Sequence, residues 1–129
     1  MGPGEKMMTT AMAGALVAAA LAAGAPSAAA RVDPGCAELD VCFYKTADDW
    51  AHGQPTGSYR GVTGFPQELG PDAYGAYAVY SALNEERALL HMTAAGDGHV
   101  YGICLAPYEQ RVLWPDTVRT VYIDGKAGC

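Results

Sequence analysis

The stretch Asp33–Lys45, DPGCAELDVCFYK, places two cysteines close together immediately before an apolar run that is rich in strand-forming residues. Cys36 and Cys42 are separated by five residues, so a bond between them would close a small ring and fix the direction of the chain. The run that follows, Val41–Lys45, has the composition of a β-strand. This stretch therefore predicts the start of a disulfide-stapled β domain.

The residues before this stretch have the pattern of an export signal. Residues 10–30 are almost entirely Ala, Gly, Leu and Val, and they end in PSAAA, which resembles a signal-peptidase site. The apolar part is shorter than the roughly 20 residues that a membrane span needs. We therefore predict a cleaved signal peptide over residues 1–30 and a single secreted, extracellular domain over residues 31–129; the alternative is a retained N-terminal anchor.

The composition narrows the classes of partner. The formal net charge of −6 argues against nucleic acid or an anionic membrane surface as a partner of the domain. A domain of this size has a thin core, so cross-links would add useful stability. We expect a soluble monomer with no membrane contact after the signal is removed.

All four cysteines lie after the predicted signal, and an even number in an exported chain indicates disulfides. Three pairings are possible. Proximity favours Cys36 with Cys42, which leaves Cys104 with Cys129. The alternative, a zinc site, is disfavoured because the chain has neither a CxxC nor an HxxxH pair.

Short apolar and β-branched runs recur between turn residues and predict seven or eight strands. The segment 88–106 is predicted to be a hairpin, because residues 94–99 supply flexible turn chemistry. A helix over 81–92 is the alternative, since residues 84–90 have high helix propensity. Residues 47–57 are predicted to be a turn-rich loop with Trp50 as a core or edge plug. The predicted strands are residues 41–45, 58–63, 77–83, 88–93, 100–106, 111–114 and 118–124.

A faint internal repeat suggests a duplicated β motif. The order Gly61-Val62, then LGPD at 69–72, then a strand around Ser81 is echoed by Gly102-Ile103, LWPD at 113–116 and a strand around Thr120. Two packed Greek-key halves would each bury surface that neither half buries alone. Chance similarity between Gly/Pro-punctuated strands is the alternative explanation.

Taken together, these residues resemble a known family. The exported N-terminus, the Cys36–Cys42 pair followed by Phe43-Tyr44, and the segments VYSALN (79–84) and VRTVY (118–122) are similar to the small secreted peptidase inhibitors of actinobacteria. The resemblance implies an all-β, βγ-crystallin-like sandwich of two Greek-key motifs. It also implies inhibition of an extracellular protease, the type member being a metalloproteinase inhibitor.

A protease-binding loop should be exposed and rigid before it binds, because preorganisation removes the entropic cost of ordering. The preferred candidate is stiffened by proline and follows Cys104; the alternative is the segment 51–56, and an ordinary strand connection is the simplest reading of both. The residues of the preferred loop are Ala106, Pro107, Tyr108, Glu109 and Gln110.

The sequence favours neither a metal site nor an active site. The positions that would bind calcium in a crystallin-like motif are Ala76 and Tyr77 in one half, and Asp116 alone in the other. His52, His91 and His99 are scattered, although the last two could face each other across the hairpin. We therefore expect no cofactor and no catalytic residue, and a small hydrolase that pairs a histidine with Ser81 or a carboxylate is the third hypothesis.

The leading hypothesis is thus a secreted, non-enzymatic protein that binds an extracellular protease through an exposed loop. The alternative is a secreted structural or cell-envelope binding module without inhibitory activity. Eight tyrosines, seven of them from Tyr59 onward, suit a protein or carbohydrate contact surface as well as half-buried strands.

Overall fold

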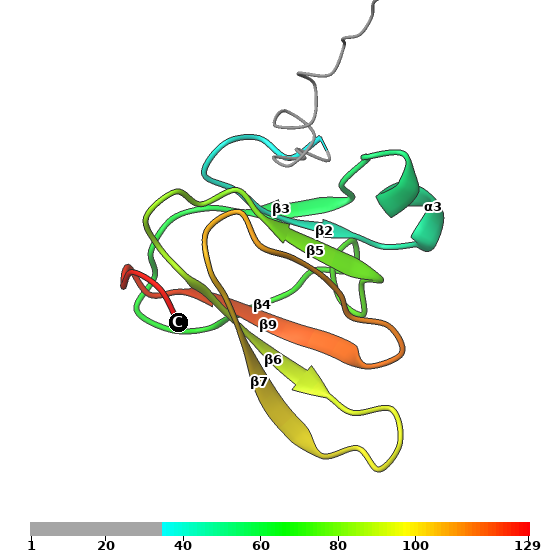
Figure 1. Ribbon diagram of the computed structural model, residues 1–129. Coiled ribbons are helices and arrows are strands. Elements are labelled where there is room, and N and C mark those ends of the chain that lie inside the picture. Colours follow the sequence, from blue (N-terminus) through cyan, green and yellow to red (C-terminus); the bar gives the residue numbers. More distant parts are fainter. Residues whose placement is uncertain (1–34) are drawn as a thin grey trace, which may run out of the picture. The chain divides into compact units, whose positions relative to one another are not determined.

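The computed structural model describes residues 35–129, so the predicted signal peptide over 1–30 lies outside the described residues. The described part contains eight strands and one short helix (Figure 1). In chain order these are β2 (Val41–Tyr44), α3 (Ala47–Ala51), β3 (Gly57–Tyr59), β4 (Gln67–Glu68), β5 (Ala78–Ser81), β6 (Ala88–Thr93), β7 (Val100–Leu105), β8 (Gln110–Val112) and β9 (Thr117–Ile123).

The strands form two four-stranded antiparallel sheets. One sheet has the order β3-β2-β5-β8 and the other has the order β4-β9-β6-β7. Every strand pair is antiparallel. The prediction of an all-β protein with a disulfide-stapled sandwich of two sheets is therefore confirmed.

The two sheets are built by an exchange of strands. In each half of the chain a first pair of neighbouring strands (β2 and β3, then β6 and β7) is followed by a strand that lies in the opposite sheet (β4, then β8). The fourth strand of each half, β5 or β9, then returns to pair with the first strand of its own half. Each sheet thus contains three strands from one half and one from the other.

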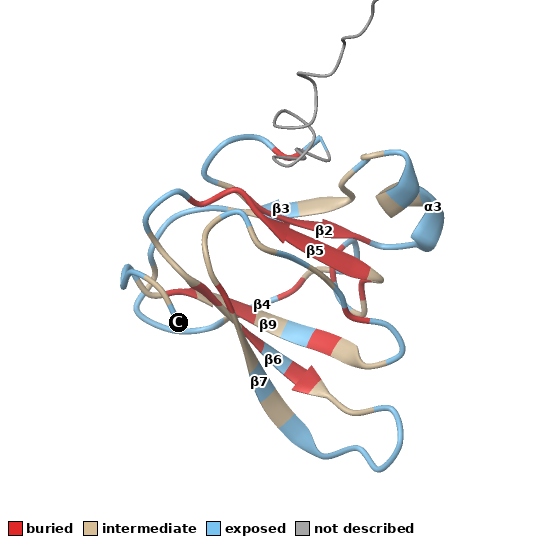
Figure 2. Cartoon of the chain, in the orientation of Figure 1, coloured by how far each residue is buried: buried red, intermediate tan, exposed pale blue. Residues whose placement is uncertain are grey.

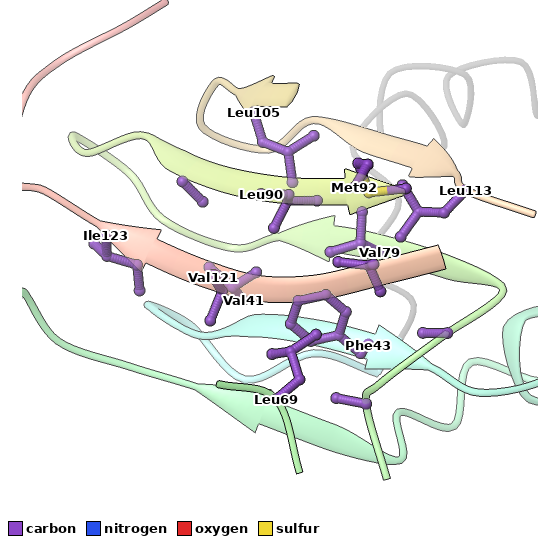
Figure 3. Close-up of a cluster of buried hydrophobic side chains, with 14 of the residues drawn as sticks. Val41, Phe43, Leu69, Val79, Leu90, Met92, Leu105, Leu113, Val121 and Ile123 are labelled. Carbon is purple, nitrogen blue, oxygen red and sulfur yellow. The ribbon is translucent and has the colours of Figure 1, made fainter. Parts of the chain in front are cut away.

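The main core lies between the two sheets. Alternate residues of a strand point to opposite faces, so Val41 and Phe43 of β2 and Val79 of β5 contribute to it from one sheet. Leu90 and Met92 contribute from β6 and Val121 from β9, all fully buried (Figure 3). Burial of these side chains is the main favourable term for holding the two sheets together.

A second, smaller core covers the other face of the first sheet. Cys42 and Tyr44 of β2 point to this face, with Ala78 and Tyr80 of β5. The two strands are therefore buried on both faces, as Figure 2 shows. Trp50, predicted as a core or edge plug, packs edge to face on Tyr44, with ring centroids 4.8 Å apart.

The region 47–57 is not a loop throughout, because it begins with helix α3. The helix starts with a capping box: Thr46 Oγ1 accepts a hydrogen bond from Asp49 N at 3.0 Å, and Asp49 Oδ2 accepts one from Thr46 N at 3.1 Å. This reciprocal cap satisfies backbone donors that a five-residue helix would otherwise leave exposed. The prediction of a turn-rich loop was wrong over residues 47–51.

Other boundaries also differ from the prediction. The strand expected over 58–63 ends at Tyr59, since Gly61 adopts a positive φ of 92°. Strand β4, only two residues long, was not predicted. The helix considered over 81–92 is absent from the described chain, where β5 and β6 are separated by a turn. The β6–β7 hairpin is confirmed, with His91 opposite Gly102.

The disulfides have the pairing that proximity favoured. Cys36 bonds Cys42 and Cys104 bonds Cys129. The first pair is buried in the second core, with both residues at most 3% exposed, whereas Cys129 is exposed. The two cross-links therefore differ in access to solvent.

We expect mild thiol treatment of the folded protein to open Cys104–Cys129 first, because thiol–disulfide exchange requires access to the sulfur atoms. Opening this bond, which spans 25 residues, should lower the free energy of unfolding by about 3.5 kcal/mol from loop closure. Alkylation followed by peptide mapping measures the order, and denaturant unfolding measures the loss. Labelling of Cys36 and Cys42 before Cys129 would contradict this order.

Candidate functional site

The loop that was predicted to bind a protease connects the two sheets. Ala106, Pro107, Tyr108 and Glu109 lie between β7 and β8, and Gln110 is the first residue of β8. The chain enters the loop from Leu105, which is fully buried, and leaves it toward Leu113, which is 5% exposed. The loop is therefore fixed to the main core at both ends.

The loop closes as a tight turn. Glu109 N donates a hydrogen bond to Ala106 O at 3.1 Å, and Tyr108 adopts a positive φ of 63°. Proline at the second position and positive φ at the third are the features of a type II turn. A positive φ is uncommon for a residue with a side chain, and it persists only where surrounding contacts enforce it.

The Glu109 side chain supplies those contacts. Its Oε1 accepts a hydrogen bond from Ala106 N at 2.9 Å, and its Oε2 accepts one from Arg111 Nη2 at 2.6 Å. Its backbone O accepts a hydrogen bond from Ser81 N of β5 at 2.9 Å. One residue thus ties the start of the turn, the end of the turn and the neighbouring strand together.

These contacts favour the charged form of Glu109. The Ala106 N–H lowers the pKa of the Glu109 carboxyl, and the Arg111 guanidinium lowers it further, against an opposing effect of burial. The carboxylate is therefore the form that holds the turn closed. Tyr108, at the tip, is 37% exposed.

A cavity of about 370 Å³ lies near the far end of β8. The exposed indole of Trp114 forms part of its wall, and the Trp114 backbone is fixed because its N–H donates to Tyr77 O at 3.2 Å. The Lys45 ammonium donates to Pro71 O at 3.0 Å and to Tyr74 O, which leaves the aliphatic stem to line the cavity. The lining residues are Lys45, Thr46, Ala47, Gly75, Tyr77 and Trp114.

The alternative loop, residues 51–56, is bound to the helix and the sheet. Gln54 N donates to Asp49 O at 2.9 Å, and Thr56 N donates to Phe43 O at 2.8 Å. His52 Nδ1 lies 2.8 Å from Asp48 O. Thr56 Oγ1 also accepts a hydrogen bond from Lys45 N at 3.1 Å and donates to Asp72 O at 2.7 Å. These contacts anchor the segment to other parts of the domain, whereas the Glu109 side chain bonds the first residue of its own turn.

The histidines do not converge. His91 Nδ1 lies 3.0 Å from Thr120 Oγ1 on β9, and His99 Nδ1 lies 2.6 Å from Asp97 Oδ1. They do not face each other, because the β6–β7 pairing ends at Thr93 and Val100 and leaves His99 beyond the ladder. The idea of a His91–His99 pair was wrong, since the register places Gly102 opposite His91.

Nor does Ser81 form a nucleophilic pair with a histidine. Ser81 is fully buried, and its Oγ lies 3.4 Å from Leu83 N. Within residues 35–129 no group of three or more His, Cys, Asp or Glu side chains is placed to hold a metal ion. Over the same residues, no helix is long and apolar enough to cross a membrane.

The clamp at Glu109 and the cavity at Trp114 were not predicted from the sequence. A glutamate directly after the Pro107-Tyr108 pair and two residues before Arg111 was the signal available for the clamp. The cavity had no such signal, because Lys45, Gly75 and Trp114 come from separate parts of the chain.

We expect the loop to loosen in acid. Because the pKa of Glu109 is lowered by folding, its stabilisation is present above the ordinary pKa of about 4.3 and is lost as the pH falls through the folded value. An NMR titration should show the Ala106 amide and the Glu109 side-chain carbonyl moving together below pH about 4.3. The E109Q variant should abolish that step at Ala106, and a Glu109 pKa above the ordinary value would contradict the clamp.

Comparisons with protein-family models, with curated proteins and with solved structures gave no match. The resemblance to the secreted peptidase inhibitors therefore rests on the short motifs of the sequence. Function has to be argued from the loop, the adjoining strand and the cavity themselves.

Proposed function

We propose that this chain is a secreted, non-enzymatic peptidase inhibitor that binds an extracellular protease through Ala106, Pro107, Tyr108, Glu109 and Gln110. The observation that carries the proposal is the closed turn. Glu109 accepts hydrogen bonds from Ala106 N and Arg111 Nη2, and this holds Tyr108 at the exposed tip. These contacts order the loop before any protease binds, which is what a substrate-like loop requires.

The rigidity of the loop matters for inhibition in two ways. A loop that is ordered before binding loses little conformational entropy when a protease docks on it. Drawing the same loop out toward a conformation suited to cleavage would break the contacts of Glu109 with Ala106, Arg111 and Ser81. The loop therefore combines favourable docking with resistance to hydrolysis.

We also propose that the domain has the crystallin-like arrangement of two Greek-key motifs. The support is the strand exchange, in which β4 pairs with β9 and β8 pairs with β5. The two halves place equivalent strands in equivalent positions of their sheets. A duplicated motif accounts for that equivalence. Part of the faint repeat agrees with it, because LGPD (69–72) follows β4 and LWPD (113–116) follows β8. The first part does not, because Gly61-Val62 lies beyond β3 whereas Gly102-Ile103 lies within β7.

Secretion is part of the same proposal. Two disulfides are compatible with an extracellular protein, because such bonds persist in oxidising compartments. The signal-like composition of residues 10–30 supports the same location. A peptidase outside the cell would then be the accessible target.

Stoichiometric titration of proteases tests the inhibitory function. The purified protein should abolish the activity of a thermolysin-like or a subtilisin-like protease near equimolar ratio. The E109A variant should weaken inhibition at least about tenfold, because the turn must then be ordered during binding. E85A removes an exposed glutamate in the turn between β5 and β6 and should inhibit as well as the natural chain. Full protease activity in excess protein would overturn the inhibitory function.

A second candidate, a cell-envelope binding module without inhibitory activity, is favoured by the cavity at Trp114. The exposed indole, the Tyr77 ring and the Lys45 stem give a mainly apolar concave surface of the kind that binds small ligands or ring faces. Retention on purified wall material that is lost in W114A, with proteases unaffected, would identify this function instead.

A further inference from the structure

Strand β8 lies at an edge of the first sheet. It pairs with β5 on one side, and within residues 35–129 no other strand pairs with its outer side. The pairing places Tyr80 opposite Gln110, Val79 opposite Arg111 and Ala78 opposite Val112. Each of the three residues of β8 is therefore paired with one residue of β5.

The hydrogen bonds at the two ends of β8 show which backbone groups face outward. Ser81 N donates to Glu109 O at 2.9 Å, and Leu113 N donates to Tyr77 O at 2.7 Å. In an antiparallel pair the residues that bond to the neighbour alternate with residues that do not. Glu109, Arg111 and Leu113 therefore face β5, and the backbone N–H and C=O groups of Gln110 and Val112 point away from it.

These outward groups have no backbone partner among the described contacts. An N–H and C=O pair on each of two alternate residues is the pattern that another extended backbone matches. A sugar or a small apolar ligand does not reproduce that alternation of donors and acceptors. The geometry therefore selects an extended polypeptide.

The exposed side chains along β8 indicate the character of that polypeptide. Val112 is 49% exposed and Trp114, two residues further on, is 67% exposed. With Tyr108 they make three of the eight large hydrophobic residues that are exposed in the described chain, all within seven residues of one another. Exposed apolar side chains gathered beside open backbone groups favour an apolar partner over a charged one.

Two prolines limit how much of the edge can be used. Pro107 precedes β8 and Pro115 follows it, and neither carries a backbone N–H to pair. Beyond Val112 the Trp114 N–H already donates to Tyr77 O at 3.2 Å, so the usable edge spans Gln110 to Val112. Such a length suits a single short segment and disfavours the long edge-to-edge pairing that leads to aggregation.

We propose that β8 is a docking edge: an extended segment of a partner polypeptide adds to the first sheet as a fifth strand, with apolar side chains against Val112 and Trp114. Its backbone bonds to the N–H and C=O groups of Gln110 and Val112 supply affinity, and the apolar contacts supply selectivity. This inference goes beyond the proposed function, because the partner need not be a peptidase and the Glu109 clamp need not contribute.

The test uses synthetic peptides and the isotopically labelled full chain. The probes are acetylated and amidated heptapeptides of alternating threonine and a varied apolar residue, namely valine, leucine, phenylalanine or tryptophan. On titration, the largest amide shift changes should fall on Gln110 and Val112, whose N–H groups face outward. The amides of β7, the longer open edge of the other sheet, should change little. N-methyl groups can be placed on either of the two alternate sets of peptide residues. N-methylation of the set whose N–H groups bond to β8 should weaken binding at least about tenfold, and N-methylation of the other set should not.

Variants of the protein separate the backbone from the side chain. V112P removes the outward N–H, a change tolerated at a sheet edge, and should weaken binding at least about tenfold. V112T keeps that N–H and should weaken binding only severalfold. V62T changes an exposed valine elsewhere and should leave affinity unchanged. Thermal unfolding shows whether V112P is folded, and peptide N-methylation tests the same bonds with the natural protein.

Three results would overturn the docking edge. The first is that no peptide binds at millimolar concentration. The second is that the shift changes are centred away from β8. The third is that peptides N-methylated at either set of alternate residues bind with equal affinity. Protease inhibition is measured separately with E109A, so a docking edge on a protein that inhibits nothing, or the reverse, would be recognised.

Discussion

The exchange of one strand between the two sheets is the constraint on which the rest of this structure depends. Strand β8 belongs by sequence to the half that contains β6, β7 and β9, yet it pairs with β5 of the other half. Placing it there buries Leu113 in the main core and forces the chain to cross from one sheet to the other after Leu105. The crossing is the loop that we propose as the binding site. The site is therefore a consequence of how the core is closed.

The crossing is short, so the backbone conformation of its residues is constrained by the strands packed at both of its ends. Four residues join β7 to β8, and a tight turn is needed to reverse the chain in that length. The positive φ at Tyr108 is tolerated because the Glu109 carboxylate bonds Ala106 N and Arg111 Nη2. The same turn delivers β8 to the edge beside β5 with Gln110 and Val112 facing outward. Loop and edge thus form one continuous exposed surface.

Much of the fold could be predicted from short-range patterns. Apolar and β-branched runs between turn residues identified the strands around Val79, Leu90 and Val121, and proximity identified Cys36–Cys42 and with it the second disulfide. Features fixed by contacts distant in sequence could not be predicted. The two-residue strand β4 has no pattern of its own and exists because Gln67 pairs with Val121. Helix α3 was missed because a single capping box outweighed the turn residues that surround it. The cavity at Trp114 depends on three separated segments.

Strand β8 is bonded to β5 on one side, and within residues 35–129 no strand pairs with its other side. Native-state hydrogen exchange of the full chain, read residue by residue, measures this directly. We expect slow exchange at Arg111 and Leu113, which face β5, and fast exchange at Gln110 and Val112, which face away from it. Exchange at the Val112 amide as slow as at the Arg111 amide would show that the outer side of β8 is already covered. That result would contradict the docking edge and the continuous exposed surface that β8 forms with the loop.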